Sequence, residues 1–192
     1  YYDRKNWYPN KHTIVRNNLI EKVPGDGIVP IGCDSTLIEY NLMCDSPDIL
    51  PMTEAAAGIW PWSCDNTIIQ YNEVWGHKAP WDAQGFDSDY NCQNTLIQYN
   101  YSHDNYGGMV LICNSGNAGD YSCGNIGSIV RYNISIGDGI RPKETRQGMF
   151  SPSIHIAGPV KQTLVERNII HANPKPSDAV DRTIITSDSW DG

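Results

Sequence analysis

The hydrophobic and polar positions of this 192-residue chain recur in a fixed pattern. Each copy begins with Thr or Ser, continues with two aliphatic residues and two further residues, and ends with Asn. The six copies cover residues 13–18, 36–41, 67–72, 95–100, 128–133 and 163–168, and their final Asn residues are 23, 31, 28, 33 and 35 residues apart. Such self-similarity predicts a solenoid whose shortest turn has about two dozen residues.

Each repeat is expected to contain short strands, because the chain has no long apolar stripe with a helical period of 3.6 residues. The third copy alternates as a half-buried strand does, with Thr67, Ile69 and Tyr71 on one side. The chain should bend sharply at the final Asn, which tolerates left-handed dihedrals. Its amide can then bond to the equivalent Asn of the next turn, so the pattern predicts a stacked Asn ladder.

A second strand precedes most copies and usually opens with Gly, at residues 27–31, 58–62, 85–89 and 108–112, with a looser member at 153–156. The residue after Gly is apolar in all four copies and should point inward, so the side chains two and four positions after Gly should point outward. The column expected to face outward consists of Val29, Ile31, Trp60, Trp62, Asp87, Asp89, Val110, Ile112 and His155.

Through the Asn-ended repeat and the Gly-led strand, residues 11–172 resemble the right-handed parallel β-helix of the pectin-lyase-like superfamily. The resemblance implies an all-β, single-stranded solenoid of about six to seven coils, with one domain over residues 1–192. Members of that superfamily are mostly secreted or cell-surface enzymes that act on carbohydrates. It also implies that the outward face of the Gly-led strand forms a saccharide cleft, flanked by loops at 43–57, 73–84, 101–107 and 134–147.

Asp87 and Asp89 are the first candidates for catalysis. They lie two residues apart on one strand, so they share a face with their Cα atoms roughly 6.5 Å apart. Carboxylates at such a separation suit glycoside hydrolysis, and their mutual repulsion would raise one pKa and leave the other group ionised. The alternatives are a surface acid pair or a calcium site, and no other cofactor is expected.

Aromatic side chains next to this pair are candidates for binding sugar. Trp60 and Trp62 lie one turn earlier, and Trp81 belongs to the adjoining loop. Flat aromatic rings suit the apolar face of a pyranose. The alternative is that these tryptophans pack beneath the inserted loops.

The loops supply further polar candidates. The insertion before the Asp strand carries His77, Lys78, Asp82 and Gln84. The insertion before the His155 strand carries Arg141, Lys143, Glu144, Arg146 and Gln147. Glu144 is a candidate third acid, and His77, Arg146 and His155 are candidate substrate ligands.

These features predict a glycoside hydrolase that cleaves a polysaccharide or oligosaccharide. The first alternative is a lyase or epimerase on uronate chains, because residues 85–89 are similar to the active strand of β-helix uronate epimerases. Asp89 and Cys113 stand where those enzymes have a His and a second Asp. The uronate carboxylate would have to be neutralised by Lys78, Arg141 or Arg146, or by a metal at Asp87 and Asp89. The second alternative is a non-catalytic solenoid, which predicts no pocket over Asp87 and an oxidised cysteine column.

Composition narrows the range of partners. With 14 basic and 22 acidic side chains the formal net charge is −8, which argues against nucleic acid and anionic membranes. There is no run of 18 apolar residues, so no membrane span is expected. The chain starts at Tyr1 and ends after a weak seventh copy at 183–186 without a recognisable cap. We therefore expect a processed product or a fragment, or a solenoid that packs through its open ends.

The cysteines show a regular spacing of their own. Cys33, Cys64 and Cys92 each lie seven residues before a Tyr-Asn pair, which predicts that they stack on successive turns. Turns of a parallel solenoid are about 4.8 Å apart, within reach of a disulfide. A bridge between two of them, or between Cys113 and Cys123, is one expectation, and a column of buried reduced thiols is the other.

Overall fold

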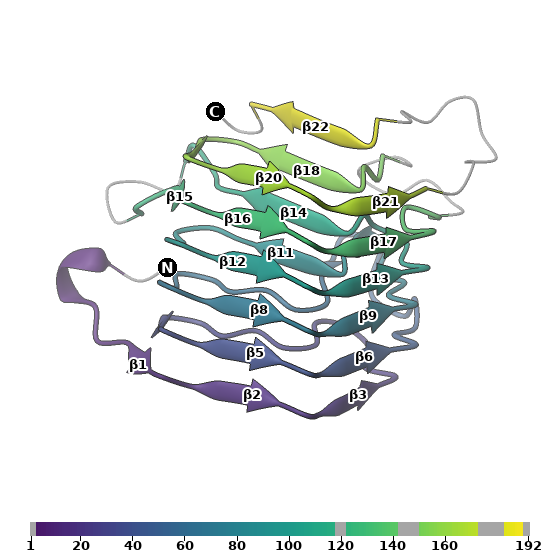
Figure 1. Cartoon of the computed structure of the whole chain (residues 1–192), viewed down its shortest axis with the longest axis horizontal. Helices are drawn as coiled ribbons and strands as arrows, with labels where there is room; N and C mark the ends of the chain where they lie inside the picture. The colour runs from purple at the N-terminus through teal and green to yellow at the C-terminus, as the bar shows by residue number, and fades with distance from the viewer. Residues whose placement is uncertain (1–2, 118–121, 142–149, 173–182, 190–192) are drawn as a thin grey trace.

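The computed structural model describes residues 3–117, 122–141, 150–172 and 183–189. The chain winds into a right-handed parallel β-helix, and three parallel sheets run along its length (Figure 1). This confirms the predicted all-β solenoid. Among the residues described, no helix is both long enough and apolar enough to cross a membrane.

Two of the sheets have six strands each. Sheet 1 is built from the Asn-ended repeats and consists of β2 (Ile14–Arg16), β5 (Leu37–Glu39), β8 (Ile68–Gln70), β12 (Leu96–Gln98), β16 (Ile129–Arg131) and β20 (Leu164–Glu166). Sheet 2 follows the ladder Asn residues and consists of β3 (Leu19–Glu21), β6 (Leu42–Cys44), β9 (Glu73–Trp75), β13 (Tyr101–His103), β17 (Ile134–Ile136) and β21 (Ile169–His171).

Sheet 3 is the predicted Gly-led strand column. It consists of β11 (Phe86–Ser88), β14 (Val110–Cys113), β18 (Ile154–Ala157) and β22 (Ile185–Asp188). Isolated bridges from Ile28 to Ile59 and from Ile59 to Phe86 continue it toward the N-terminal end. The weak seventh copy was expected to repeat the ladder strand, but β22 pairs with β18 in sheet 3.

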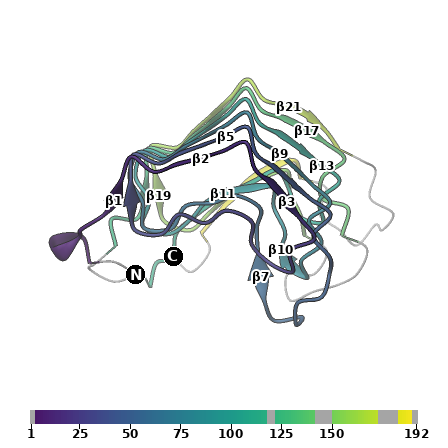
Figure 2. The same cartoon turned by 90° about the horizontal axis from the view of Figure 1, so that it is seen from below.

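Three two-stranded pairs and one short helix complete the fold. The pairs are β1 (Asn10–Lys11) with β4 (Cys33–Asp34), β7 (Ala55–Ala56) with β10 (Trp81–Asp82), and β15 (Asn125–Ile126) with β19 (Val160–Lys161). The 3-10 helix η1 (Arg4–Asn6) lies at the N-terminal end of the described chain. Seen along the solenoid, β7 and β10 form a lobe beside β11 (Figure 2).

The core lies between the three sheets. Every second strand residue points inward, as the alternating pattern predicts. The fully buried aliphatic and aromatic side chains include Ile38, Ile69, Ile97 and Val130 from sheet 1, Met43 and Val74 from sheet 2, and Ile59, Phe86, Val110, Ile112 and Ile154 from sheet 3 and its extension.

The Asn ladder is confirmed along its whole length. Asn72 Oδ1, for example, accepts hydrogen bonds from the backbone N of Asn41 (3.0 Å) and from its Nδ2 (2.9 Å). The same pair of bonds joins each successive ladder Asn from residue 18 to residue 168.

The left-handed residue at this corner was predicted wrongly. It is the residue before the ladder Asn, which is Tyr in four turns, with φ between 54° and 56°. The ladder Asn must direct its amide along the solenoid axis, so the residue before it adopts the left-handed conformation that turns the chain. Rings of the four tyrosines stack with centroids 5.1 to 5.3 Å apart, at Tyr40, Tyr71, Tyr99 and Tyr132.

One part of the expected outward column is also corrected. Phe86 pairs with Val110, so Val110 and Ile112 point into the core, and Leu111 takes the outward position beside Asp87. The reason is one additional residue after Gly108. In the preceding turn Ile59 N bonds the glycine carbonyl Gly85 O, whereas Phe86 N bonds Met109 O instead of Gly108 O. The outward positions of Trp60, Trp62, Asp87, Asp89 and His155 follow the register as predicted.

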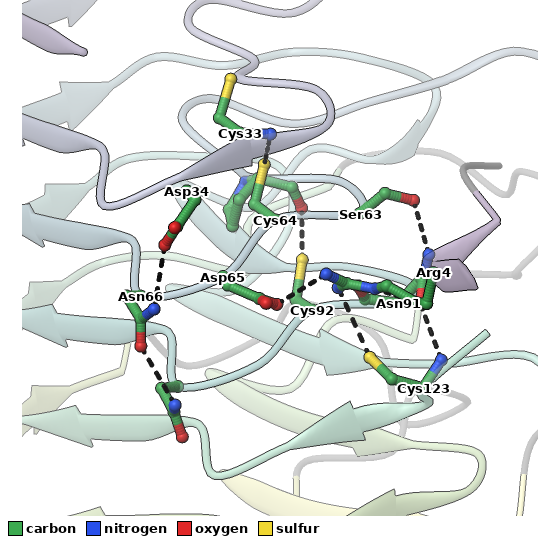
Figure 3. Close-up of polar contacts among 12 residues, drawn as sticks. Arg4, Cys33, Asp34, Ser63, Cys64, Asp65, Asn66, Asn91, Cys92 and Cys123 are labelled. Atoms are coloured by element: carbon green, nitrogen blue, oxygen red, sulfur yellow. Dashed lines mark hydrogen bonds and ion pairs between the residues drawn. The ribbon is translucent and has the colours of Figure 1, made fainter. Parts of the chain in front are cut away.

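The cysteine column stacks as expected but is not cross-linked. All six cysteines are free, so the predicted disulfides receive no support. Cys33 N donates to Cys64 Sγ (3.2 Å), and Cys92 Sγ donates to Pro61 O (3.4 Å; Figure 3). Burial raises the pKa of the Cys64 thiol to about 12, which keeps it protonated.

Arg4 ties the N-terminal segment to this corner. Its guanidinium is 2.8 Å from Asp65 Oδ1 and donates to Asn91 Oδ1 (3.2 Å; Figure 3). It also lies over the Trp7 ring, 4.3 Å from the centroid. One side chain therefore connects η1 to two successive turns of the solenoid.

Candidate active site

A small cavity lies over the outward face of β11. Its volume is about 170 Å³, and it is lined by Ala55, Trp81, Asp82, Asp87, Asp89, Tyr90, Leu111 and Cys113. Ala55 of β7 and Trp81 and Asp82 of β10 form part of the cavity lining, and these two strands pair in the lobe visible beside β11 in Figure 2. Three carboxyl groups therefore share one cavity in the middle of the solenoid.

The alternation of β11 directs two of these carboxyl groups outward. Phe86 is buried in the core, and Ser88 Oγ lies 2.9 Å from Ser128 Oγ inside the solenoid. Asp87 and Asp89 must then point to the opposite side, where both line the cavity. The structure thus brings the two predicted catalytic residues together.

Asp87 is the most enclosed of the three acids. Only 4% of it is exposed, and within the described part of the chain its Oδ1 has no hydrogen-bond partner. Burial, and then the charges of Asp89 and Asp82, raise its pKa well above the ordinary value of 3.8. Burial therefore favours the protonated form of Asp87, and Asp87 is one of the residues that line the cavity.

Asp89 is half-buried and better supported. Its Oδ1 accepts hydrogen bonds from the backbone N of Tyr90 (2.6 Å) and from Cys113 Sγ (3.1 Å). Burial raises the pKa of Asp89 to about 6, and these two bonds oppose that shift because they favour the charged form. Asp89 is the ionised member of the group at neutral pH.

Asp82 is the acid that the sequence reasoning undervalued, since it appeared only among the loop candidates. Burial and the charge of Asp89 raise the pKa of Asp82 to about 7. The cation Arg141 lowers it, and Arg141 Nη2 donates to the backbone O of Asp82 (2.7 Å). The only signal in the sequence was the position of Asp82 in the loop just before the Asp strand.

The cavity also contains atoms of the kind that bind metals. Asp87, Asp89 and Cys113 each offer one ligand atom, and these atoms lie within 4.8 Å of one another. Calcium prefers oxygen ligands, and the pKa of the Cys113 thiol is raised well above its ordinary value by burial and by the nearby carboxylates. The donor set therefore fits calcium poorly, and the calcium site stays a prediction.

The predicted aromatic residues occupy two different places. The bridge from Ile59 to Phe86 sets Trp60 next to Asp87 and Trp62 next to Asp89 on the neighbouring turn. Their rings are 6.3 Å apart, and Trp60 Nε1 donates to Asp26 Oδ1 (2.9 Å). Trp81 lines the cavity itself, whereas Trp60 and Trp62 flank it.

His77 and His155 are not among the residues that line the cavity. His77 is buried, its Nε2 lies 3.2 Å from Gly25 O, and burial lowers its pKa to about 4, so it is neutral. His155 shares the outward column with Asp87, two turns away, and its Nε2 lies 2.6 Å from Asp188 Oδ2. No pattern in the sequence pointed to Asp188 as the partner of His155.

The remaining loop candidates contribute little to the described site. Lys78 is 3.9 Å from Asp45, and Gln84 is buried. Glu144 and Arg146, with Lys143 and Gln147, lie outside the residues that the structure describes.

Among solved structures, the chain is similar to a glycoside hydrolase. Two crystal structures of the GH136 lacto-N-biosidase from Eubacterium ramulus, of the native protein and of its selenomethionine derivative, match with a TM-score of 0.56 and 27% sequence identity. Each match covers 83% of this chain and 28% of the other, so the chain spans less than a third of that protein's length. No protein-family model matches the chain, and a search of curated proteins gives no match either.

The match agrees with the β-helix fold of this chain, and the enzyme activity named in it is that of the longer neighbour. Membership of the pectin-lyase-like superfamily remains a prediction from the sequence.

Proposed function

We propose that the cavity over β11 is the active site of a glycoside hydrolase, with Asp89 as the ionised carboxylate and Asp82 as the general acid. The observation that carries the proposal is a single cavity lined by carboxyl groups with pKa values of about 6 and about 7. Glycosidases need one ionised and one protonated carboxyl group on either side of the scissile bond.

The sequence analysis paired Asp87 with Asp89, and the geometry favours Asp82 as the acid. Asp87 lies on β11 and Asp89 follows directly after the end of that strand, whereas Asp82 comes from β10 in the lobe. A general acid works best with a pKa near the operating pH, which fits Asp82 better than the more strongly raised pKa of Asp87. Burial favours the protonated form of Asp87, which can donate a hydrogen bond to a sugar hydroxyl.

In the proposed reaction the glycosidic C–O bond breaks as Asp82 gives its proton to the leaving oxygen. Asp89 either attacks the anomeric carbon as a nucleophile, and water then cleaves the resulting glycosyl–Asp89 bond, or it acts as a base that activates water for direct attack. In both cases water supplies the new hydroxyl group. Trp81 in the cavity wall, with Trp60 and Trp62 beside it, would pack on the sugar rings. The structural neighbours make a lacto-N-biosyl glycoside the first substrate to test.

The alternatives carried from the sequence are less well supported. The described residues that line the cavity include three acids and no Lys or Arg, so a uronate carboxylate would be repelled there. A non-catalytic solenoid predicted no pocket over Asp87 and an oxidised cysteine column, and neither agrees with the cavity or the free thiols.

The experiment is an assay of the purified chain, with and without EDTA, on a chromogenic lacto-N-bioside and on neutral and uronate polysaccharides. Reducing ends and the absorbance of unsaturated products are read together. We expect reducing ends without unsaturation, insensitivity to EDTA, and a loss of at least about 100-fold in kcat in Asp89→Asn and Asp82→Asn. Asp104→Asn, at an exposed carboxylate of sheet 2, is the matched control.

The pH profile provides a second readout. Activity should rise as Asp89 ionises near pH 6 and fall as Asp82 loses its proton near pH 7. If Asp87→Asn rather than Asp82→Asn abolishes activity, Asp87 is the acid. Unsaturated product would move the assignment to a lyase, and full activity in Asp89→Asn would rule out the proposed reaction.

A further inference from the structure

Cys113 is the cavity residue to which the proposed reaction gives no role. It is the last residue of β14, and the pairing of β11 with β14 sets it next to Asp89 in the outward column. Only 1% of it is exposed, and it lines the same cavity as the three acids. A buried thiol against a carboxylate is different from the other cysteines of the solenoid, whose Sγ atoms contact mainly backbone carbonyls.

The contact has the geometry of a hydrogen bond in which the thiol donates. Cys113 Sγ lies 3.1 Å from Asp89 Oδ1, the same oxygen that accepts from the backbone N of Tyr90. Oδ1 is thus held by two donors, which leaves Oδ2 as the oxygen available to a substrate. An ionised carboxylate accepts such bonds more strongly than a neutral one.

The thiol stays a donor over the working pH range. Burial, and then the charges of Asp89 and Asp87, raise the pKa of Cys113 well above its ordinary value. Asp89, whose charge opposes ionisation of the Cys113 thiol, is thus also the group that accepts the hydrogen bond from that thiol.

We propose that Cys113 is a positioning residue: its thiol donates to Asp89 Oδ1, orients the carboxylate and favours its ionised form. The role rests on the proposed function of Asp89, but the contact exists without substrate. The cavity could instead bind a divalent cation through Asp87, Asp89 and a Cys113 thiolate, and that reading is an outcome of the test.

The test combines three variants with a titration that needs no activity. The carboxyl carbons of ¹³C-labelled aspartates are followed by NMR against pH, with Asp89 assigned from the signal missing in Asp89→Asn. Cys113→Ala removes the donor, and Cys113→Val does so while filling the space, in case the alanine variant folds poorly. Cys113→Ser restores a donor, and Cys64→Ala is the control at a buried cysteine whose thiol contacts backbone carbonyls.

We expect the pKa of Asp89 to rise by about one unit in Cys113→Ala and Cys113→Val, which is the size expected for losing one hydrogen bond to a charged group. The acid limb of the pH profile should move by the same amount, so kcat/KM at pH 5 falls about tenfold. Cys113→Ser should return both to the values of the unmodified chain, and Cys64→Ala should leave both unchanged.

Two results would overturn the proposal. One is an Asp89 titration unchanged in Cys113→Ala and Cys113→Val. The other is a serine variant that behaves like alanine, which would show that shape rather than donation matters. A Cys113-dependent shift of these signals on adding Cd²⁺ would indicate the cation site instead. If the titration shifts as expected while no glycoside is cleaved, the proposed function fails and the thiol–carboxylate contact stands.

Discussion

The Asn ladder should account for a large share of the stability of this fold, and Asn100 is the position at which to test it. This side chain is 2% exposed and lies in the middle of the solenoid. Its Oδ1 accepts from Asn72 N (2.9 Å) and Asn72 Nδ2 (3.1 Å), while its Nδ2 donates to Ile69 O (2.9 Å) and Asn133 Oδ1 (3.1 Å). Asn100→Ala removes all four bonds.

The loss of stability in Asn100→Ala can be worked out from the lost hydrogen bonds and from the buried groups that they leave unpaired. Each lost hydrogen bond costs about 1 kcal/mol on average, and a buried donor without an acceptor, such as Asn72 N, costs more. We therefore expect Asn100→Ala to lower the free energy of unfolding by about 4 kcal/mol. That would be a large part of the total stability of about 5–15 kcal/mol typical of a domain.

The matched control is Asn18→Ala at the first rung. Asn18 is exposed, and its Nδ2 donates to Asn41 Oδ1 (2.9 Å) and Arg16 O (3.0 Å). Water can replace these bonds, so the loss should be about 1 kcal/mol or less. Urea unfolding followed by circular dichroism at pH 7 measures both variants. Equal losses at Asn18 and Asn100 would refute the argument, because they would mean that burial of the ladder adds nothing.

Two further predictions concern a buried acid and a glycine. Burial raises the pKa of Asp138 to about 6, so its ionised form lowers the stability above that pH, and this cost disappears as the pH falls through 6 toward 3.8. Relative to the unmodified chain, the free energy of unfolding of Asp138→Asn in urea should therefore increase by up to about 3 kcal/mol between pH 4 and pH 8. A difference that stays constant with pH would contradict this. A Cβ on Gly58 would lie 2.3 Å from Gly85 O, whereas one on Gly25 would meet nothing within 4 Å. Gly58→Ala should thus give little soluble protein while Gly25→Ala folds normally, and equal yields would show that the turn can shift.

The sequence predicted the features of the fold that each turn repeats. The ladder Asn could be found because each rung needs one side chain that both donates and accepts along the axis. The outward direction of Asp87 and Asp89 followed from the alternation of a single strand. The phase of β14 did not follow. The pattern aligned Gly108 with Gly85, whereas Phe86 pairs with Val110, so Met109 stands opposite Gly85 and the register is offset by one residue.

The site was predictable only in part, because its other members depend on pairings between distant segments. Asp82 reaches the cavity because β10 pairs with β7, two short strands that no periodicity marks. Asp188 meets His155 because β22 joins sheet 3 rather than sheet 1. The stacking of the cysteines follows from the rung spacing, whereas their oxidation state does not.

The electrostatics of the cavity connect the scaffold to the proposed chemistry. Three carboxyl groups are held close together, and the one nearby guanidinium that the structure describes, Arg141, donates to the backbone O of Asp82. Burial is the main cause of the raised pKa values of Asp82, Asp87 and Asp89. Burying three carboxyl groups lowers the stability, and the rest of the solenoid has to offset this loss. A cavity in which an ionised Asp89 lies beside two further carboxyl groups favours positive charge that develops at a sugar carbon and disfavours an anionic substrate. This is the physical reason to test neutral glycosides before uronates.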